Sequence, residues 1–215
     1  MSSATSTGGA KPDGLSFQRQ LFLFNSIPQN RSTRLMGSNP ETKPALRWRA
    51  ILFICATTLI AALWPVYAYF YGVTSTEIVL AVAYFVTAGM SITVGYHRMI
   101  SHRAFRARRW TEAALLVCGS AAWQGSALAW ASDHLRHHSY TDTRRDPYNI
   151  KQGVVHAHVG WLFRRTVATS PQPAYLTSDP LIVWQDRYYV PLAVFTSFIV
   201  PYAIAGVGGF LLAGV

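Results

Sequence analysis

Two apolar runs of membrane-spanning length, joined by a short polar link, constrain this chain more than any other feature. The first extends from Ile51 to about Val73 and the second from Ile78 to Tyr96, and neither contains a charged residue. A bilayer core takes about 20 helical residues to cross, so each run predicts a transmembrane helix. The link at 74–77 is so short that the two helices form an antiparallel hairpin, and both outer ends lie on one side of the membrane.

Two further stretches are apolar enough to belong to the membrane region. Residues 189–215 predict a third span, which Pro191, Pro201 and several glycines could kink. Residues 111–132 are long enough to cross the membrane but carry Gln124, glycines and serines. The predicted fold class is therefore all-α and integral to the membrane, with a helical hairpin and a further span.

The basic residues predict the orientation of the chain. Seven of the 19 Lys and Arg residues precede Ile51, five lie at 97–109 and seven lie at 136–187, whereas the link between the first two spans has none. By the positive-inside rule, the N-terminus and the segments after the hairpin face the cytosol. We predict a polar, partly disordered cytosolic segment at 1–48 and one membrane domain at 49–215, with a cytosolic cap at 97–188. Basic flanks on apolar spans argue against nucleic acid as a partner.

Three of the seven histidines fall within five residues, at His134, His137 and His138. On a helix these positions lie within an arc of about 100°, so the three imidazoles would face one pocket. His97 and His102 are about 140° apart on an ideal helix, and they could share one ion only if the helix unwinds there. Otherwise they would serve two different ions. A hydrogen-bonded histidine cluster or a solvated loop is the alternative without a metal.

Both histidine groups are predicted on the same side of the membrane, which constrains the stretch between them. If residues 111–132 crossed the bilayer once, the two groups would be on opposite faces. We therefore expect this segment to lie at the membrane interface or under the cap without crossing. His156 and His158 would point to opposite sides of a helix, so at most one of them faces a metal.

The ligand types favour iron over zinc. The zinc-protease pattern His-Glu-x-x-His is absent, and none of the three glutamates is near the histidines. Five to seven imidazoles with few carboxylates suggest a histidine-rich pair of iron ions. Asp133, Asp142 and Asp146 could orient imidazole N–H groups from outside the ligand set, although helix capping and turn formation explain them about equally well.

Three motifs resemble those of a known family, over about residues 87–189. They are His-Arg-x-x-x-His at 97–102, Asp-His-x-x-His-His-x-Tyr-Thr-Asp-Thr-x-x-Asp-Pro-Tyr-Asn at 133–149, and His-Val-Gly-Trp-Leu at 158–162. Together they are similar to the membrane-bound fatty acid desaturases of the Δ9, stearoyl-CoA desaturase-like group.

The resemblance implies a specific reaction. Members of that group carry four transmembrane helices under a cytosolic cap with two iron ions. They insert a cis double bond, at Δ9 here, into a long saturated acyl chain carried on CoA or a lipid. The reaction uses dioxygen and two electrons from a donor of the cytochrome b5 or ferredoxin type. The membrane would be that of the endoplasmic reticulum in a eukaryote and the cytoplasmic membrane in a bacterium.

The resemblance also implies roles for individual residues. The metal ligands would be His97, His102, His134, His137 and His138, and no separate catalytic residue is implied. Trp130 matches an aromatic position beside the acyl tunnel. His158 matches a histidine of the family, and its role as a ligand or as a supporting residue stays open.

Two departures from the family pattern affect these expectations. The third histidine box, His-Asn-x-x-His-His, does not occur in the 215 residues, so we expect this chain to be inactive on its own. Ser132 stands where acyl-CoA members often have Arg, which leaves the acyl carrier open. The alternatives are a membrane hydroxylase or ketolase with the same histidine boxes, and a non-catalytic membrane fragment.

Overall fold

A computed structural model describes residues 46–164 and 172–215. In these ranges the chain folds into helices, and the one isolated β-bridge pairs Leu46 with Arg164. Within the described part of the chain, three helices are long and apolar enough to cross a membrane. The predicted all-α membrane fold is therefore confirmed. The predicted N-terminal segment falls almost wholly outside the described residues.

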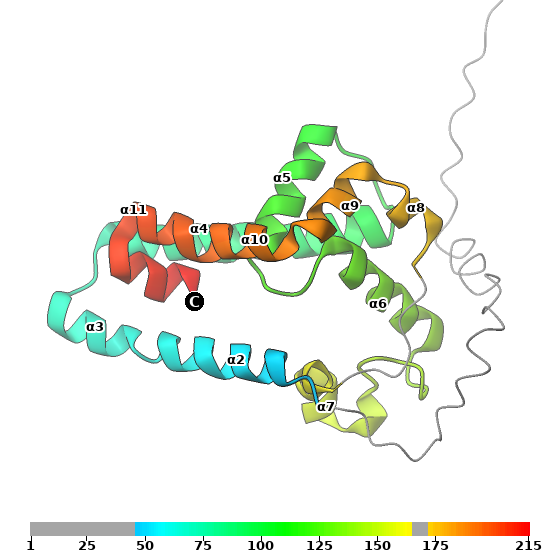
Figure 1. The fold of residues 1–215 in the computed structure, drawn as a ribbon, viewed down its shortest axis with the longest axis horizontal. Coiled ribbons are helices and arrows are strands. Elements are labelled where there is room, and N and C mark those ends of the chain that lie inside the picture. The colour runs from blue at the N-terminus through cyan, green and yellow to red at the C-terminus, as the bar shows by residue number, and fades with distance from the viewer. Residues whose placement is uncertain (1–45, 165–171) are drawn as a thin grey trace, which may run out of the picture.

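The predicted hairpin forms the long axis of the molecule (Figure 1). α2 (Trp48–Ala61) and α3 (Trp64–Tyr71) make one 24-residue span, about 36 Å long, which exceeds the bilayer core. Gly72, with φ of 75°, ends α3. α4 (Ser75–Met90) then begins with a capping box, in which Thr74 and Glu77 each accept a hydrogen bond from the other's backbone N–H.

The second span changes its helical form where it approaches the histidines. After α4 the chain continues as the π-helix η2 (Ser91–Ser101), and the two together form a 27-residue span. No residue of α2 or α3 and only Glu77 of α4 is buried within the protein, as expected of helices that face lipid, whereas most of η2 is buried.

The third apolar stretch consists of α10 (Tyr189–Val194), η5 (Phe195–Ile199), α11 (Val200–Gly209) and η6 (Phe210–Gly214). The predicted kink is a reversal of direction. Ala205 and Gly206 have non-helical backbone angles, and the chain then runs back beside η5 (Figure 1). As a result Phe210 lies against Phe198, with ring centroids 5.7 Å apart, although 12 helical residues would separate them by about 18 Å.

The stretch between the two histidine groups does not form a spanning helix. It is divided between α5 (Arg109–Ser120) and the start of α6 (Ala127–Tyr140), with a loop between them. α5 has 12 residues and is about 18 Å long, too short for the bilayer core. Figure 1 shows that α5 runs across the direction of α4 and α10. That residues 111–132 do not cross the membrane stays a prediction.

Short helices complete the cap. They are η3 (Ile150–Gln152), α7 (Val154–His158), η4 (Gly160–Phe163), α8 (Ala174–Thr177) and α9 (Pro180–Arg187). The buried apolar core lies where η2, α5, α6, α8 and α9 meet, and Tyr96, Leu116 and Leu176 are fully buried in it. This core fixes the position of η2 relative to α6, the two helices that carry five of the histidines.

Candidate metal centre

Four imidazoles from two helices point their Nε2 atoms at one another. His102 Nε2 lies 3.0 Å from both His97 Nε2 and His134 Nε2, and His138 Nε2 lies 3.0 Å from His134 Nε2. All four ligand atoms lie within 4.8 Å of one another. No other group of three or more potential ligands converges in this way in residues 46–164 and 172–215.

The π-helix explains how His97 and His102 come to share this site. A π-helix is bonded from residue i to residue i+5, which places side chains five residues apart on one face. The bond from His102 N to His97 O is of this type, at 3.0 Å. Ser101 supports the same geometry, because its hydroxyl donates to the carbonyl of Tyr96, five residues earlier, at 2.7 Å. The helix is therefore unwound at this point, as the spacing of His97 and His102 required if they were to face one site.

The helix α6 presents the other two imidazoles. Ser126 begins it as an N-cap whose side chain accepts from Ala129 N. His134 and His138 are four residues apart and therefore lie one above the other on the face toward η2. Trp130, one turn before His134, stacks on that imidazole with ring centroids 4.8 Å apart. The Trp130 indole N–H donates to Gln124 Oε1 at 3.1 Å, which fixes the ring beside the histidines.

The environment favours the neutral form of three imidazoles, those of His102, His134 and His138. Burial, reinforced by the neighbouring histidines, lowers the pKa of His134 to about 3 and the pKa of His102 to about 4. Burial also lowers the pKa of His138. Neutral imidazole is the form that binds metal ions, so the site requires no deprotonation at neutral pH.

The spacing of the nitrogens fits a transition-metal ion. With metal–nitrogen bonds of about 2.1 Å, two nitrogens 3.0 Å apart subtend about 90° at the ion. The four-histidine group, defined as His97, His102, His134 and His138, thus brings four imidazole nitrogens close enough together to hold a metal ion.

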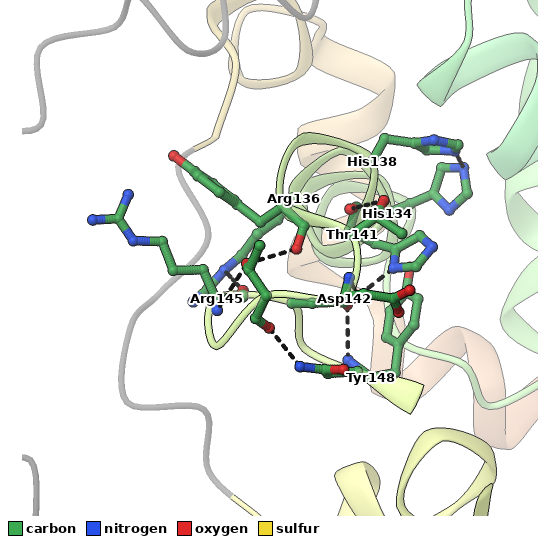
Figure 2. Close-up of polar contacts among 12 residues, drawn as sticks. His134, Arg136, His138, Thr141, Asp142, Arg145 and Tyr148 are labelled. Carbon is green, nitrogen blue, oxygen red and sulfur yellow. Dashed lines mark hydrogen bonds and ion pairs between the residues drawn. The ribbon is translucent and has the colours of Figure 1, made fainter. Parts of the chain in front are cut away.

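His137 does not join the four-histidine group. Its Nδ1 lies 2.9 Å from Asp146 Oδ1, and its ring packs on Tyr148 with centroids 4.4 Å apart. Asp146 is buried and also accepts from the backbone N–H groups of Asp142, at 2.9 Å, and Tyr148, at 3.2 Å. Figure 2 shows this loop folded against the end of α6. With Nδ1 engaged, the Nε2 of His137 is the atom left to bind a ligand.

The remaining predicted residues lie around this loop or away from the site. Asp142 contributes its backbone N–H to Asp146 and has a left-handed backbone, with φ of 59°. Burial raises the pKa of the Tyr148 phenol, and the nearby carboxylates of Asp146 and Asp133 raise it further. His158 is exposed in α7 and does not belong to the four-histidine group.

The sequence predicted no role for two residues that lie at the site. Gln124 was visible only as a polar residue in an apolar stretch, and the structure shows it bonded to Trp130. Tyr148 lies within the Asp-Pro-Tyr-Asn motif, which indicates a turn, but its contact with His137 depends on how the loop folds back.

Comparison with known proteins agrees with this site. Residues 75–215 match the model of the fatty acid desaturase family. A probable acyl-CoA desaturase of Schizosaccharomyces pombe is 33% identical over 237 residues, which cover 100% of this chain and 48% of that protein. Stearoyl-CoA desaturase 4 of Mus musculus is 35% identical over 75% of this chain and 46% of its own length.

A lipid-linked relative is also similar. The sn-1 stearoyl-lipid 9-desaturase of Anabaena variabilis is 29% identical over 75% of this chain and 60% of its own length. The chain thus spans less than two thirds of the length of each of these three relatives. The match to the family model over residues 75–215, most of the chain, leads to one conclusion: the chain belongs to the fatty acid desaturase family.

Proposed function

We propose that this chain forms part of an acyl desaturase that inserts a cis double bond into a long saturated acyl chain at the Δ9 position. The observation that carries the proposal is the four-histidine group at the end of a membrane-spanning hairpin, in a chain of the fatty acid desaturase family. This arrangement supports oxidative chemistry on a substrate that lies in the membrane.

The metal content that we propose is two iron ions. The four-histidine group supplies ligands for one ion, and His137, oriented by Asp146, supplies a ligand for the other. The chemistry supplied by bound iron is the activation of dioxygen, with two electrons, for removal of two hydrogens from adjacent methylene groups. The family resemblance and the convergence of the four imidazoles support this assignment.

The chain's own residues prepare the site for that chemistry. His102 and His134 are neutral because burial lowers their pKa values, so they offer lone pairs without losing a proton. Trp130 covers His134 with its ring and places its N–H on Gln124. In our proposal the exposed part of this ring contacts the acyl chain and keeps water from the reacting methylenes.

The substrate carrier and the partners follow from the same resemblance. Relatives named for acyl-CoA and for stearoyl-lipid substrates are both similar to this chain, so we propose an acyl-CoA or acyl-lipid substrate. The electron donor would be of the cytochrome b5 or ferredoxin type. The membrane would be the endoplasmic reticulum or the bacterial cytoplasmic membrane, with the cap in the cytosol because the basic residues flank the spans on that side.

Expression in a desaturase-deficient host tests the proposal, using the complete coding sequence that contains these residues. Gas chromatography with mass spectrometry of the fatty acids should show new Δ9-monounsaturated chains. His137→Ala should abolish them, whereas His156→Ala, which changes a histidine outside the four-histidine group, should preserve them. A hydroxylated product without an alkene would contradict desaturation, and the absence of any product with a correctly inserted protein would favour a non-catalytic role.

A further inference from the structure

A buried amide on α9 connects the two helices that carry the four-histidine group. Gln185 is fully buried. Its Oε1 accepts from the backbone N–H of Ala127 at 3.0 Å, and its Nε2 donates to Tyr96 Oη at 2.9 Å and to Ser120 Oγ at 3.0 Å. One side chain thus bonds η2, α5 and the first residue of α6.

The bond to Tyr96 fixes the rotation of η2. Tyr96 is fully buried and directly precedes His97. Its hydroxyl accepts from Gln185 and donates to Leu116 O at 3.3 Å. Because Tyr96 and His97 are neighbours on one helix, holding the phenol in the core determines the direction in which the His97 imidazole leaves the helix.

The bond to Ala127 fixes the position of α6 along its axis. Ala127 and Ala131 are fully buried, and His134 and His138 continue the same stripe of the helix. The next residue of α9, Asp186, accepts a hydrogen bond from the N-cap hydroxyl of Ser126. The beginning of α6 is therefore bonded to α9 at two adjacent positions, and His134 follows two turns later.

We propose that Gln185 is a positioning residue that sets the register between η2 and α6, so that the four Nε2 atoms meet. Metal sites need their ligands placed within about 0.5 Å, which apolar packing alone enforces poorly. Bonding to Ala127, Tyr96 and Ser120 requires one acceptor atom and one atom that donates twice, and a neutral amide supplies both. A buried carboxylate would supply no donor and would carry a desolvation cost. The proposal rests on the proposed function only in taking the four-histidine group to bind a metal.

Cobalt binding to the purified full chain tests this role, with Co²⁺ as the probe. Gln185→Met keeps the length and volume of the side chain but removes its hydrogen bonds. The hydroxyls of Tyr96 and Ser120 keep Leu116 O as a partner, so the fold should survive. We expect Co²⁺ affinity to fall at least tenfold and the visible absorption bands of bound Co²⁺ to shift.

A matched control separates positioning from general stability. Ile182 lies one turn earlier on α9 and is also buried, and Ile182→Val removes packing without touching a hydrogen bond. This variant should melt at a lower temperature but bind Co²⁺ with the affinity and spectrum of the parent. Tyr96→Phe removes one of the bonds to Gln185, and its effect on Co²⁺ affinity should not add to that of Gln185→Met.

A measurement without metal distinguishes failure of this inference from failure of the proposed function. The ring centroids of His97 and His134 are 4.6 Å apart. Cysteines at both positions, in a background with Cys55→Ala and Cys118→Ala, should therefore be bridged by a short phenylene bis-maleimide, which spans the gap that the two imidazoles fill. Gln185→Met should reduce the yield several-fold. An unchanged yield, or parental Co²⁺ binding in Gln185→Met, would overturn the positioning role. A reduced yield in a chain that binds no Co²⁺ would instead overturn the metal site and leave the positioning role standing.

Discussion

The histidines of α6 divide into two environments, although they are adjacent in sequence. His134 and His138 face η2, whereas His137 turns to Asp146. The helical spacing predicted that all three imidazoles would face one pocket, but an arc of about 100° is wide enough for His137 to turn away from the other two. The buried carboxylate of Asp146 decides it, because its loop folds back only in the tertiary structure.

This division predicts different metal contents for two variants. His134→Ala removes the imidazole that lies 3.0 Å from two of its partners, so the ion of the four-histidine group should be lost. His137→Ala should leave that ion in place, because His137 is outside the group. Metal analysis of the purified proteins by mass spectrometry measures both. Equal loss of metal in the two variants would contradict the division.

The lowered histidine pKa values predict how the stability of the metal-free protein depends on pH. The pKa values of His134, about 3, and His102, about 4, lie below the ordinary value of 6.5, so below pH 6.5 the unfolded chain binds more protons than the folded one. Their contribution to stability should be complete above pH 6.5 and should decrease as the pH falls from 6.5 to about 3, the folded-state pKa of His134. Thermal melting across this range measures it, and His134→Gln should melt with a weaker pH dependence than the parent.

At the scale of the helix, the unwound form of η2 could be predicted from the sequence only conditionally. The spacing of His97 and His102 required an unwound helix for a shared ion, and the π-helix provides it. No propensity predicts a π-helix at this position, because its wider turn is stabilised by contacts from elsewhere. Tyr96 is held by Gln185, and Ser101 bonds to the carbonyl of Tyr96.

The packing of α5 against η2 yields a prediction on stability. A methyl group at Gly119 would lie 2.6 Å from Tyr96 Cε1 and 2.8 Å from its Cζ, closer than real contacts allow. Gly119→Ala should therefore displace the phenol and destabilise the protein by about 1–3 kcal/mol. Thermal unfolding in detergent measures this, and Co²⁺ binding should weaken with it because Tyr96 adjoins His97.

Gly89→Ala is the matched control for this prediction. Gly89 lies in α4, and a methyl group there would meet no atom within 4 Å. Since alanine is favoured over glycine in a helix by about 0.5–1 kcal/mol, this variant should be as stable as the parent or more so. Destabilisation of both variants by the same amount would attribute the effect to helix propensity or lipid contacts and not to the Tyr96 contact.

At the scale of the whole molecule, hydropathy and charge predicted the hairpin, the third apolar stretch and the cap, because a bilayer permits few backbone arrangements. The reversal at Gly206 was beyond these rules. Prolines and glycines at 189–215 indicated a kink, but the angle depends on what the returning segment contacts. Gly208 packs on Glu77 and Tyr67, so closely that any side chain there would collide with them. Gly206 itself has φ of 60° and ψ of −147°, angles essentially restricted to glycine.

The reversal predicts a cross-link that a straight span would forbid. Phe198 and Phe210 contact each other across the turn, with ring centroids 5.7 Å apart, whereas a continuous helix would hold them about 18 Å apart. In a background with Cys55→Ala and Cys118→Ala, the pair Phe198→Cys and Phe210→Cys should be bridged within one chain by a short phenylene bis-maleimide in detergent, because the linker fills the space of the two rings that touch. The pair Val190→Cys and Phe210→Cys is the control: Val190 is eight residues, about 12 Å of helix, before Phe198 and should not cross-link. Mass spectrometry of the digested protein identifies the bridge. Absence of the 198–210 bridge, or equal yields from the two pairs, would contradict the reversal at Gly206.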